Sequence, residues 1–144
     1  MKPVYQRKQR PAHDPEFSAA ARGLSRALLA VHKQLLERAR IEYERAHGRQ
    51  TPAQMWNLLI SDPFFAWLRP LSGAVAQLDE LRATETDRGP YRLLTDELRR
   101  MLTSGDPGDP FAGPYARSLQ SPDVIEVHAA ARRALESFEA SIER

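Results

Sequence analysis

Residues 55–81 read MWNLLISDPFFAWLRPLSGAVAQLDEL. No other window of the chain holds as much apolar bulk. The stretch contains seven leucines or isoleucines together with the large side chains of Met55, Trp56, Phe64, Phe65 and Trp67. Because burial of apolar surface is the main driving force of folding, we expect this stretch to lie inside the protein, with amphipathic segments from both flanks covering it.

The length and composition indicate one folded domain. The 144 residues are 42% hydrophobic and 28% charged, which is typical of a globular domain with its own core. The absence of cysteine excludes disulfides, thiolate metal sites and thiol catalysis. The first residues lack the apolar run of a secretory signal, and no uncharged apolar stretch reaches the length of a membrane span. We therefore expect a cytoplasmic protein that makes no membrane contact.

The net charge of +2 arises at the start of the chain. Residues 1–16 carry four cations and two acids, and the rest of the sequence is balanced. Residues 1–13 have two prolines and little to bury, so we predict a disordered basic tail there and a single helical domain over residues 14–144.

Proline marks where helices begin. Six prolines each follow Asp, Thr or Ser, namely Pro15, Pro52, Pro63, Pro107, Pro110 and Pro122. A capping side chain followed by proline is typical of a helix start, because proline lacks an N–H group that would have no partner there. Few residues are β-branched and no segment alternates between apolar and polar, so a sheet is not expected.

These signals predict an all-α protein, a four-helix-type bundle with additional short helices. The first helix has apolar residues at helical spacing from Phe17 to Ala39, with Gly23 as a possible break. Pro70 requires a kink or a new helix start. The predicted helices cover residues 15–47, 52–60, 64–68, 71–81, 90 onward, 115–119 and 122–142, with loops over 82–89 and 103–114. We expect Phe111 to fold back onto the core.

Two histidines are the candidates for a cofactor site. His32 lies within the apolar stripe of the first helix, and His128 borders the apolar face of the last. Inward histidines can bind haem or metal, but neither His32 nor His128 stands in a Glu-x-x-His or His-x-x-x-His spacing. We therefore expect no metal and no cofactor, and keep a cavity lined by His32, His128 or Arg69 as an alternative.

No pattern of catalytic residues stands out. The adjacent acids at 79–80 and 96–97 fall on helix surfaces, where such residues are usually solvated or paired. The sequence has no Gly-x-Ser-x-Gly turn and no glycine loop suited to phosphate. We therefore do not expect an enzyme.

Arg69 stands between Leu68 and Pro70 in the most apolar part of the chain. Its guanidinium either reaches out to solvent or pairs with Asp62 or Asp79. A third alternative is contact with an anion or a partner at the Pro70 kink.

On the first helix, Arg38 and Glu42 have the four-residue spacing that favours an ion pair.

The segment Asp62-Pro63-Phe64-Phe65-Ala66-Trp67-Leu68-Arg69-Pro70-Leu71-Ser72 resembles a recurring segment of small helical bacterial proteins that carry no assigned activity. The resemblance covers this segment and, loosely, the helices around it. It implies a helical fold and transfers no catalytic residue.

The supply of aromatic residues suggests binding of another macromolecule. It exceeds what a small bundle needs, so we expect part of it to form an exposed patch for a protein partner or a second copy of the chain. The candidate interaction residues are Trp56, Phe64, Phe65, Trp67 and Arg69. The alternatives are that all the rings are core, that the bundle binds a small molecule or cofactor, or that the basic tail binds nucleic acid.

Overall fold

The computed structural model describes residues 14–84 and 87–143, so the predicted basic tail lies outside the described residues. Within these ranges the chain forms helices and no strand, which confirms the all-α prediction. None of the described helices is both long enough and apolar enough to cross a lipid bilayer.

The longest element is α2, Pro15–His47. The Asp14 side chain caps it by accepting hydrogen bonds from the backbone N–H groups of Glu16 and Phe17 at 3.0 and 3.4 Å. The helix continues without interruption through Gly23 and ends at Gly48, whose φ of 88° suits glycine. One face is buried along most of its length, through Phe17, Ala21, Leu24, Leu28, Val31, Leu35 and Ala39.

The segment that opened the sequence analysis folds into three consecutive elements. They are α3, Pro52–Ser61, the 3₁₀ helix η2, Pro63–Leu68, and α4, Arg69–Thr84. Pro70 stands at the second residue of α4, so it restarts the helix as the sequence suggested. The predicted loop over 82–89 is too long, because polar contacts extend α4 by another turn: Arg82 pairs with Asp79, and the Thr84 hydroxyl donates to the Glu80 carbonyl at 2.8 Å.

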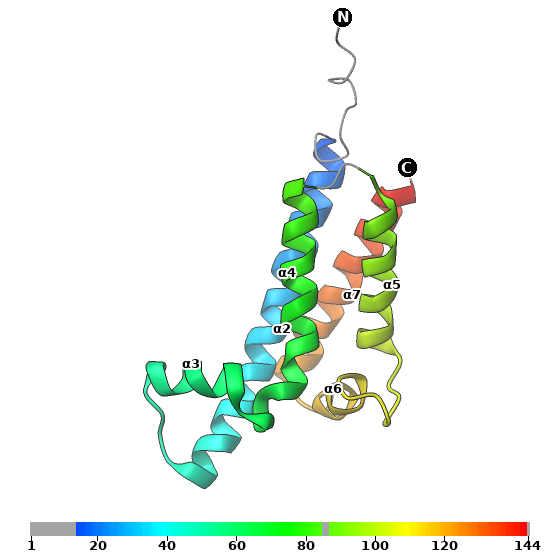
Figure 1. Cartoon of the computed structure of the whole chain (residues 1–144). Coiled ribbons are helices and arrows are strands. Elements are labelled where there is room, and N and C mark those ends of the chain that lie inside the picture. Colours follow the sequence, from blue (N-terminus) through cyan, green and yellow to red (C-terminus); the bar gives the residue numbers. More distant parts are fainter. Residues whose placement is uncertain (1–13, 85–86, 144) are drawn as a thin grey trace, which may run out of the picture.

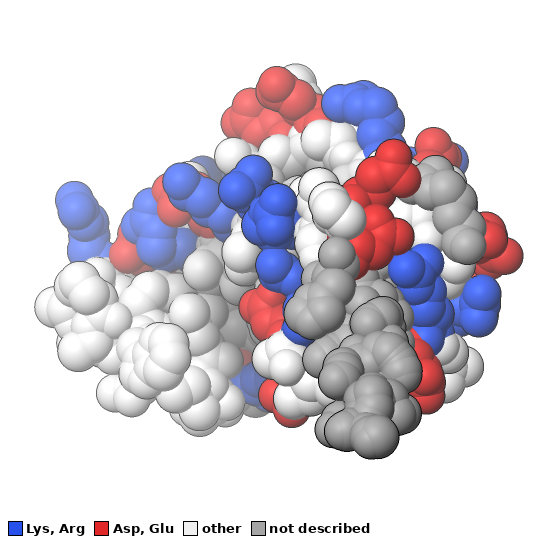
Figure 2. All heavy atoms as spheres, turned by 90° about the horizontal axis from the view of Figure 1, so that it is seen from above, with Lys and Arg blue, Asp and Glu red and all other residues white. Residues whose placement is uncertain are grey.

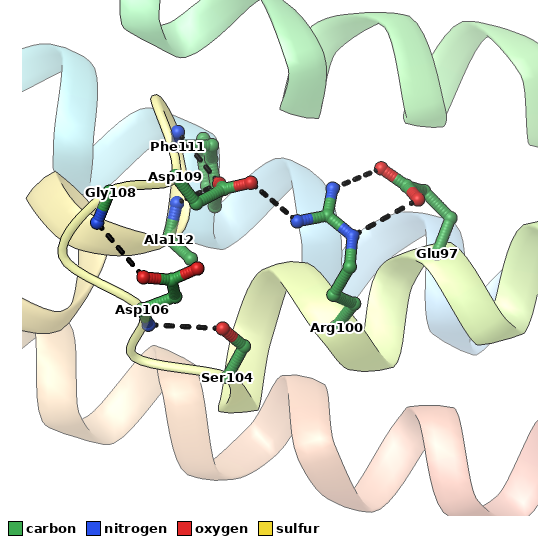
Figure 3. A network of polar contacts seen from close by, with 8 residues as sticks. All are labelled: Glu97, Arg100, Ser104, Asp106, Gly108, Asp109, Phe111 and Ala112. Carbon is green, nitrogen blue, oxygen red and sulfur yellow. Dashed lines mark hydrogen bonds and ion pairs between the residues drawn. The ribbon is translucent and has the colours of Figure 1, made fainter.

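The second half of the chain forms α5, Gly89–Thr103, α6, Ala112–Ser118, and α7, Pro122–Glu143. Helix α6 starts before the predicted residue 115 because Asp109 caps it, accepting from the N–H groups of Phe111 and Ala112 at 3.0 and 2.6 Å. These hydrogen bonds, with Arg100 donating to Asp109, hold the pKa of that carboxyl below its usual range. Figure 3 shows how Arg100 joins Glu97 on α5 to this loop.

The four longer helices lie side by side (Figure 1). They contact one another in the order α2, α4, α5, α7 and back to α2. Most of the interior comes from α2, α5 and α7, together with the half of the aromatic stretch that begins at Phe65. Phe111 is buried on the same core, as the sequence predicted.

One end of the bundle is closed by a cluster of aromatic rings and an arginine that was not predicted from the sequence. Phe17, Tyr91 and Phe138 pack as a cluster of rings with centroids 5.0–5.7 Å apart. The guanidinium of Arg88 lies 4.2 Å above the Phe17 ring, and its Nη1 donates to the Ser141 carbonyl at 2.6 Å. Arg88 thereby ties the start of α5 to the start of α2 and the end of α7.

We predict opposite effects for two glycine-to-alanine substitutions. In Gly113→Ala, the new Cβ would lie 2.9 Å from the Pro107 carbonyl oxygen, so the loop backbone must shift. We expect a loss of about 1–3 kcal/mol in the free energy of unfolding, as for other overpacked sites.

Gly23→Ala is the matched control, because nothing lies within 4 Å of a Cβ at that position. It should gain about 0.5–1 kcal/mol from helix propensity. Urea denaturation measures both variants, and equal effects at the two positions would contradict the proposed close contact in the loop.

Candidate functional site

Helix α3 is an arm on the outside of the bundle (Figure 1). It has no buried side chain. Trp56 and Ile60 are 64% and 57% exposed, and their four-residue spacing places them on the same face of the helix. The expectation that the entire stretch from Met55 lies inside is therefore wrong for α3.

The arm is also without charge. Residues 51–61 contain no Asp, Glu, Lys or Arg. In Figure 2 the bundle body carries basic and acidic side chains close together, whereas the lobe on the left, on the side where Figure 1 places α3, is largely white. An exposed apolar surface without charge is typical of an interaction site.

Helix η2 divides the remaining candidate rings between core and surface. Phe65 is 1% exposed and belongs to the core, whereas Phe64 is 37% exposed. Trp67 is half-buried, with its ring centroid 5.8 Å from that of the buried Phe111. The Phe64 ring lies against that of Tyr43 on α2, with the two ring centroids 5.5 Å apart. The predicted interaction residues thus form an exposed set, Trp56 and Phe64, and an anchoring set, Phe65 and Trp67.

Arg69 holds the arm in place. Its Nη2 donates to the carbonyl of Ile60 at 2.8 Å and to that of Leu59 at 3.4 Å, at the C-terminal end of α3. A cation at this end also favours the helix dipole. The predicted pairing with Asp62 or Asp79 is not seen: Asp62 caps η2 by accepting from the Phe64 N–H at 2.8 Å, and Asp79 contacts Ser25 and Arg82.

The other end of the arm is capped as well. Thr51 and Gln54 form a reciprocal capping box, with hydrogen bonds of 2.8 and 3.1 Å. The preceding Gln50 donates its N–H to Glu44 of α2 at 3.0 Å, and Glu44 pairs with Arg40. The arm is therefore held in helical form by its own capping box at one end and by Arg69 of α4 at the other.

A groove of about 630 Å³ lies where α2, η2 and α6 meet. Its apolar lining includes Ile41, Phe64 and Trp67, and its charged lining consists of Glu42 and three arginines, Arg38, Arg45 and Arg117. The predicted Arg38–Glu42 ion pair is absent among the described contacts. The groove could not be predicted from the sequence, because Arg117 is far from Arg38 along the chain and only the fold brings them together.

The two candidate histidines are not brought together. His32 contacts Ser72 of α4, with Nε2 and Oγ 2.9 Å apart, and His128 contacts Tyr115 of α6, with Nδ1 and the hydroxyl oxygen 2.7 Å apart. Burial lowers the pKa of His32. Burial is also the main cause of the lowered pKa of His128, and the positive charge of Arg132 lowers it further. Neither ring lines the groove.

The described residues include no set suited to a metal ion. Among residues 14–84 and 87–143, no group of three or more His, Cys, Asp or Glu side chains is arranged to hold one. Each histidine instead has a single neutral hydroxyl partner, which suits a neutral imidazole in a structural contact.

Comparison with protein-family models, with curated proteins and with solved structures gave no match. The likeness of residues 62–72 to a segment of small helical bacterial proteins therefore stays a prediction.

Loss of the Arg69 cap should loosen α3 alone. In Arg69→Met the hydrogen bonds to Leu59 and Ile60 are lost, so we expect the opening free energy of α3 amides to fall by about 1 kcal/mol. Hydrogen–deuterium exchange measures this change. Arg26→Met is the control, since Arg26 is an exposed arginine of α2, and equal exchange of α3 in both variants would contradict the capping role.

The histidines should make stability depend on pH. A histidine whose pKa is lowered by folding binds protons more readily in the unfolded chain, so its folded contact is fully stabilising only above the unfolded pKa of about 6.5. We expect the free energy of unfolding to fall as the pH drops below that value. His32→Gln with His128→Asn, which retain a polar atom near Nε2 and Nδ1, should flatten the decline between pH values of about 5 and 7. An unchanged slope would assign the pH dependence to other groups.

Proposed function

We propose that the protein works by binding another protein, and that α3 is its docking arm. The observation that carries this proposal is the exposure of Trp56 and Ile60 on a helix without any buried side chain. Covering a large apolar side chain contributes about 1.5–3 kcal/mol, so these two residues have the most to gain from a partner. Tryptophan is also among the residue types most often found at the energetic centres of interfaces.

The caps of α3 support a binding role. An isolated helix of ten residues is marginal in water, and this arm has only a partly buried face, formed by Met55, Leu58 and Leu59. The Thr51–Gln54 box and the Arg69 hydrogen bonds supply stability at its two ends instead. A helix that is already formed loses less conformational entropy when a partner binds, which favours affinity.

We favour a partner of different sequence over a second copy of the chain. At about 1.5 Å per residue, α3 is about 15 Å long, which is short for an interface of about 800 Å² on each partner. Extending a symmetric contact across η2 to the groove would bring its arginines toward those of the other copy. Such like-charge contacts oppose self-association.

The two alternative functions have less support. A cofactor site lined by His32 and His128 is not favoured, because the two side chains contact different helices. Nucleic-acid binding by the basic tail would involve residues 1–13, which are outside the described part, and several cations of the body, such as Arg40, Arg99 and Arg132, have acidic neighbours.

Photo-crosslinking tests the docking arm. A photoreactive phenylalanine analogue replaces Trp56 or, as a control, Leu93, which is 72% exposed on α5. In cells of the source organism, we expect one discrete adduct from position 56 and none from position 93. Adding Ile60→Asp to the position-56 protein should abolish the adduct, because it places a charge on the apolar face.

The outcomes are separable. An adduct of twice the chain mass would identify a second copy and overturn our choice of a foreign partner. Equal labelling from positions 56 and 93, or labelling that survives Ile60→Asp, would contradict α3 as the docking site. Circular dichroism confirms that each variant is folded.

A further inference from the structure

The groove between α2 and α6 concentrates positive charge. Arg38 and Arg45 come from α2 and Arg117 from α6, and together they face a single glutamate, Glu42, in the lining. None of the three arginines takes part in an ion pair with a described residue. Other described arginines, such as Arg22 and Arg26, also form no ion pair with a described residue, so the distinguishing feature of the groove is that three such arginines line it together.

The helix sequence explains why these cations lack partners. Of the acids of α2 near Arg38 and Arg45, Glu37 and Glu44 pair with Arg40, and Glu42 forms no ion pair with a described residue. Glu44 is further engaged by the Gln50 N–H. This leaves Arg38 and Arg45, two turns apart on the groove side of the helix, without an acid of their own among the described contacts.

The aromatic side chains that line the groove are packed against buried rings. Trp67 lies against Phe111, and Phe64 packs edge-to-face on the buried Phe65 with ring centroids 5.1 Å apart. Ile41 is 44% exposed beside them. A ligand would therefore meet a preformed apolar surface bordered by guanidinium groups, which bind carboxylates well.

We propose that this groove binds an acidic, amphipathic segment of a partner protein, with its carboxylates on Arg38, Arg45 and Arg117 and its apolar side chains on Trp67, Phe64 and Ile41. The inference rests on the proposed function and names the chemistry of the partner. Phe64 is shared by the groove and by the exposed aromatic set that begins on α3.

The spacing of the arginines favours a peptide over other anions. Arg38 and Arg45 are seven residues apart on one helix, or about 10 Å along its axis, a spacing that suits two separate carboxylates along a peptide. Glu42 lies between them in the sequence and would repel a continuous phosphate backbone. Separate carboxylates of a peptide can avoid Glu42 while reaching the arginines on either side.

The test uses fluorescence from the groove itself. In the Trp56→Phe protein, Trp67 is the sole tryptophan. The probe is a synthetic amphipathic helix of leucine and glutamate, compared with a leucine and lysine helix of the same pattern. We expect the glutamate helix to change Trp67 emission, with an affinity that falls as salt rises, and the lysine helix to have no effect.

Matched arginine variants locate the binding site. The double variant Arg38→Gln with Arg45→Gln should raise the dissociation constant for the glutamate helix by about tenfold. The single variant Arg117→Gln should raise it as well. Arg22→Gln with Arg26→Gln removes the same charge from exposed positions of α2 and should leave it within about twofold.

Three results would overturn the inference: no response to the glutamate helix, equal losses in the two double variants, or equally tight binding of inorganic phosphate or an oligothymidylate. Because Trp56 is already replaced in this assay, such a result leaves the docking arm untouched. Conversely, a failure of crosslinking at position 56 leaves the groove measurements standing.

Discussion

The length of α2 is the constraint on which the rest of the structure depends. With 33 residues it is about 50 Å long, whereas α7, its main neighbour, has 22 residues and is about 33 Å long. Arg88 fixes the start of α2 beside the end of α7. The last turns of α2 therefore extend beyond α7 (Figure 1), and other elements must cover the residues from Ala39 onward.

The short element η2 packs against this projecting end. Phe65 is buried there, with its ring centroid 5.4 Å from that of Tyr43, while the space left between η2, α6 and α2 is the groove lined by Arg38, Arg45 and Arg117. Helix α3 lies against η2 at the same end, where Met55, Leu58 and Leu59 are only partly buried and Trp56 and Ile60 stay exposed. The exposed arm and the basic groove thus have a common geometric origin in the mismatch between two helix lengths.

Much of the fold could be predicted from local chemistry. Asp14-Pro15, Thr51-Pro52 and Asp62-Pro63 each begin a helix, since capping and the missing proline N–H act within a few residues. The inward faces of α2 and α5 also follow from their periodicity. Asp109-Pro110 gives the same local signal, and Asp109 accepts from the N–H groups of Phe111 and Ala112 at the start of α6, although the surrounding residues were predicted as a loop because they are rich in glycine, aspartate and proline.

For the candidate site, the sequence by itself determined that the region from Trp56 to Trp67 is rich in aromatic residues, poor in charge and divided by proline into short helices. It did not determine which rings are buried, since Trp56 and Phe65 are equally apolar and only packing against α2 distinguishes them. Tertiary structure also decided that Arg69 caps α3 and that Arg117 joins Arg38 and Arg45. The physical reason is one of range: capping and periodicity depend on neighbours along the chain, whereas burial and charge pairing depend on which helices meet in space.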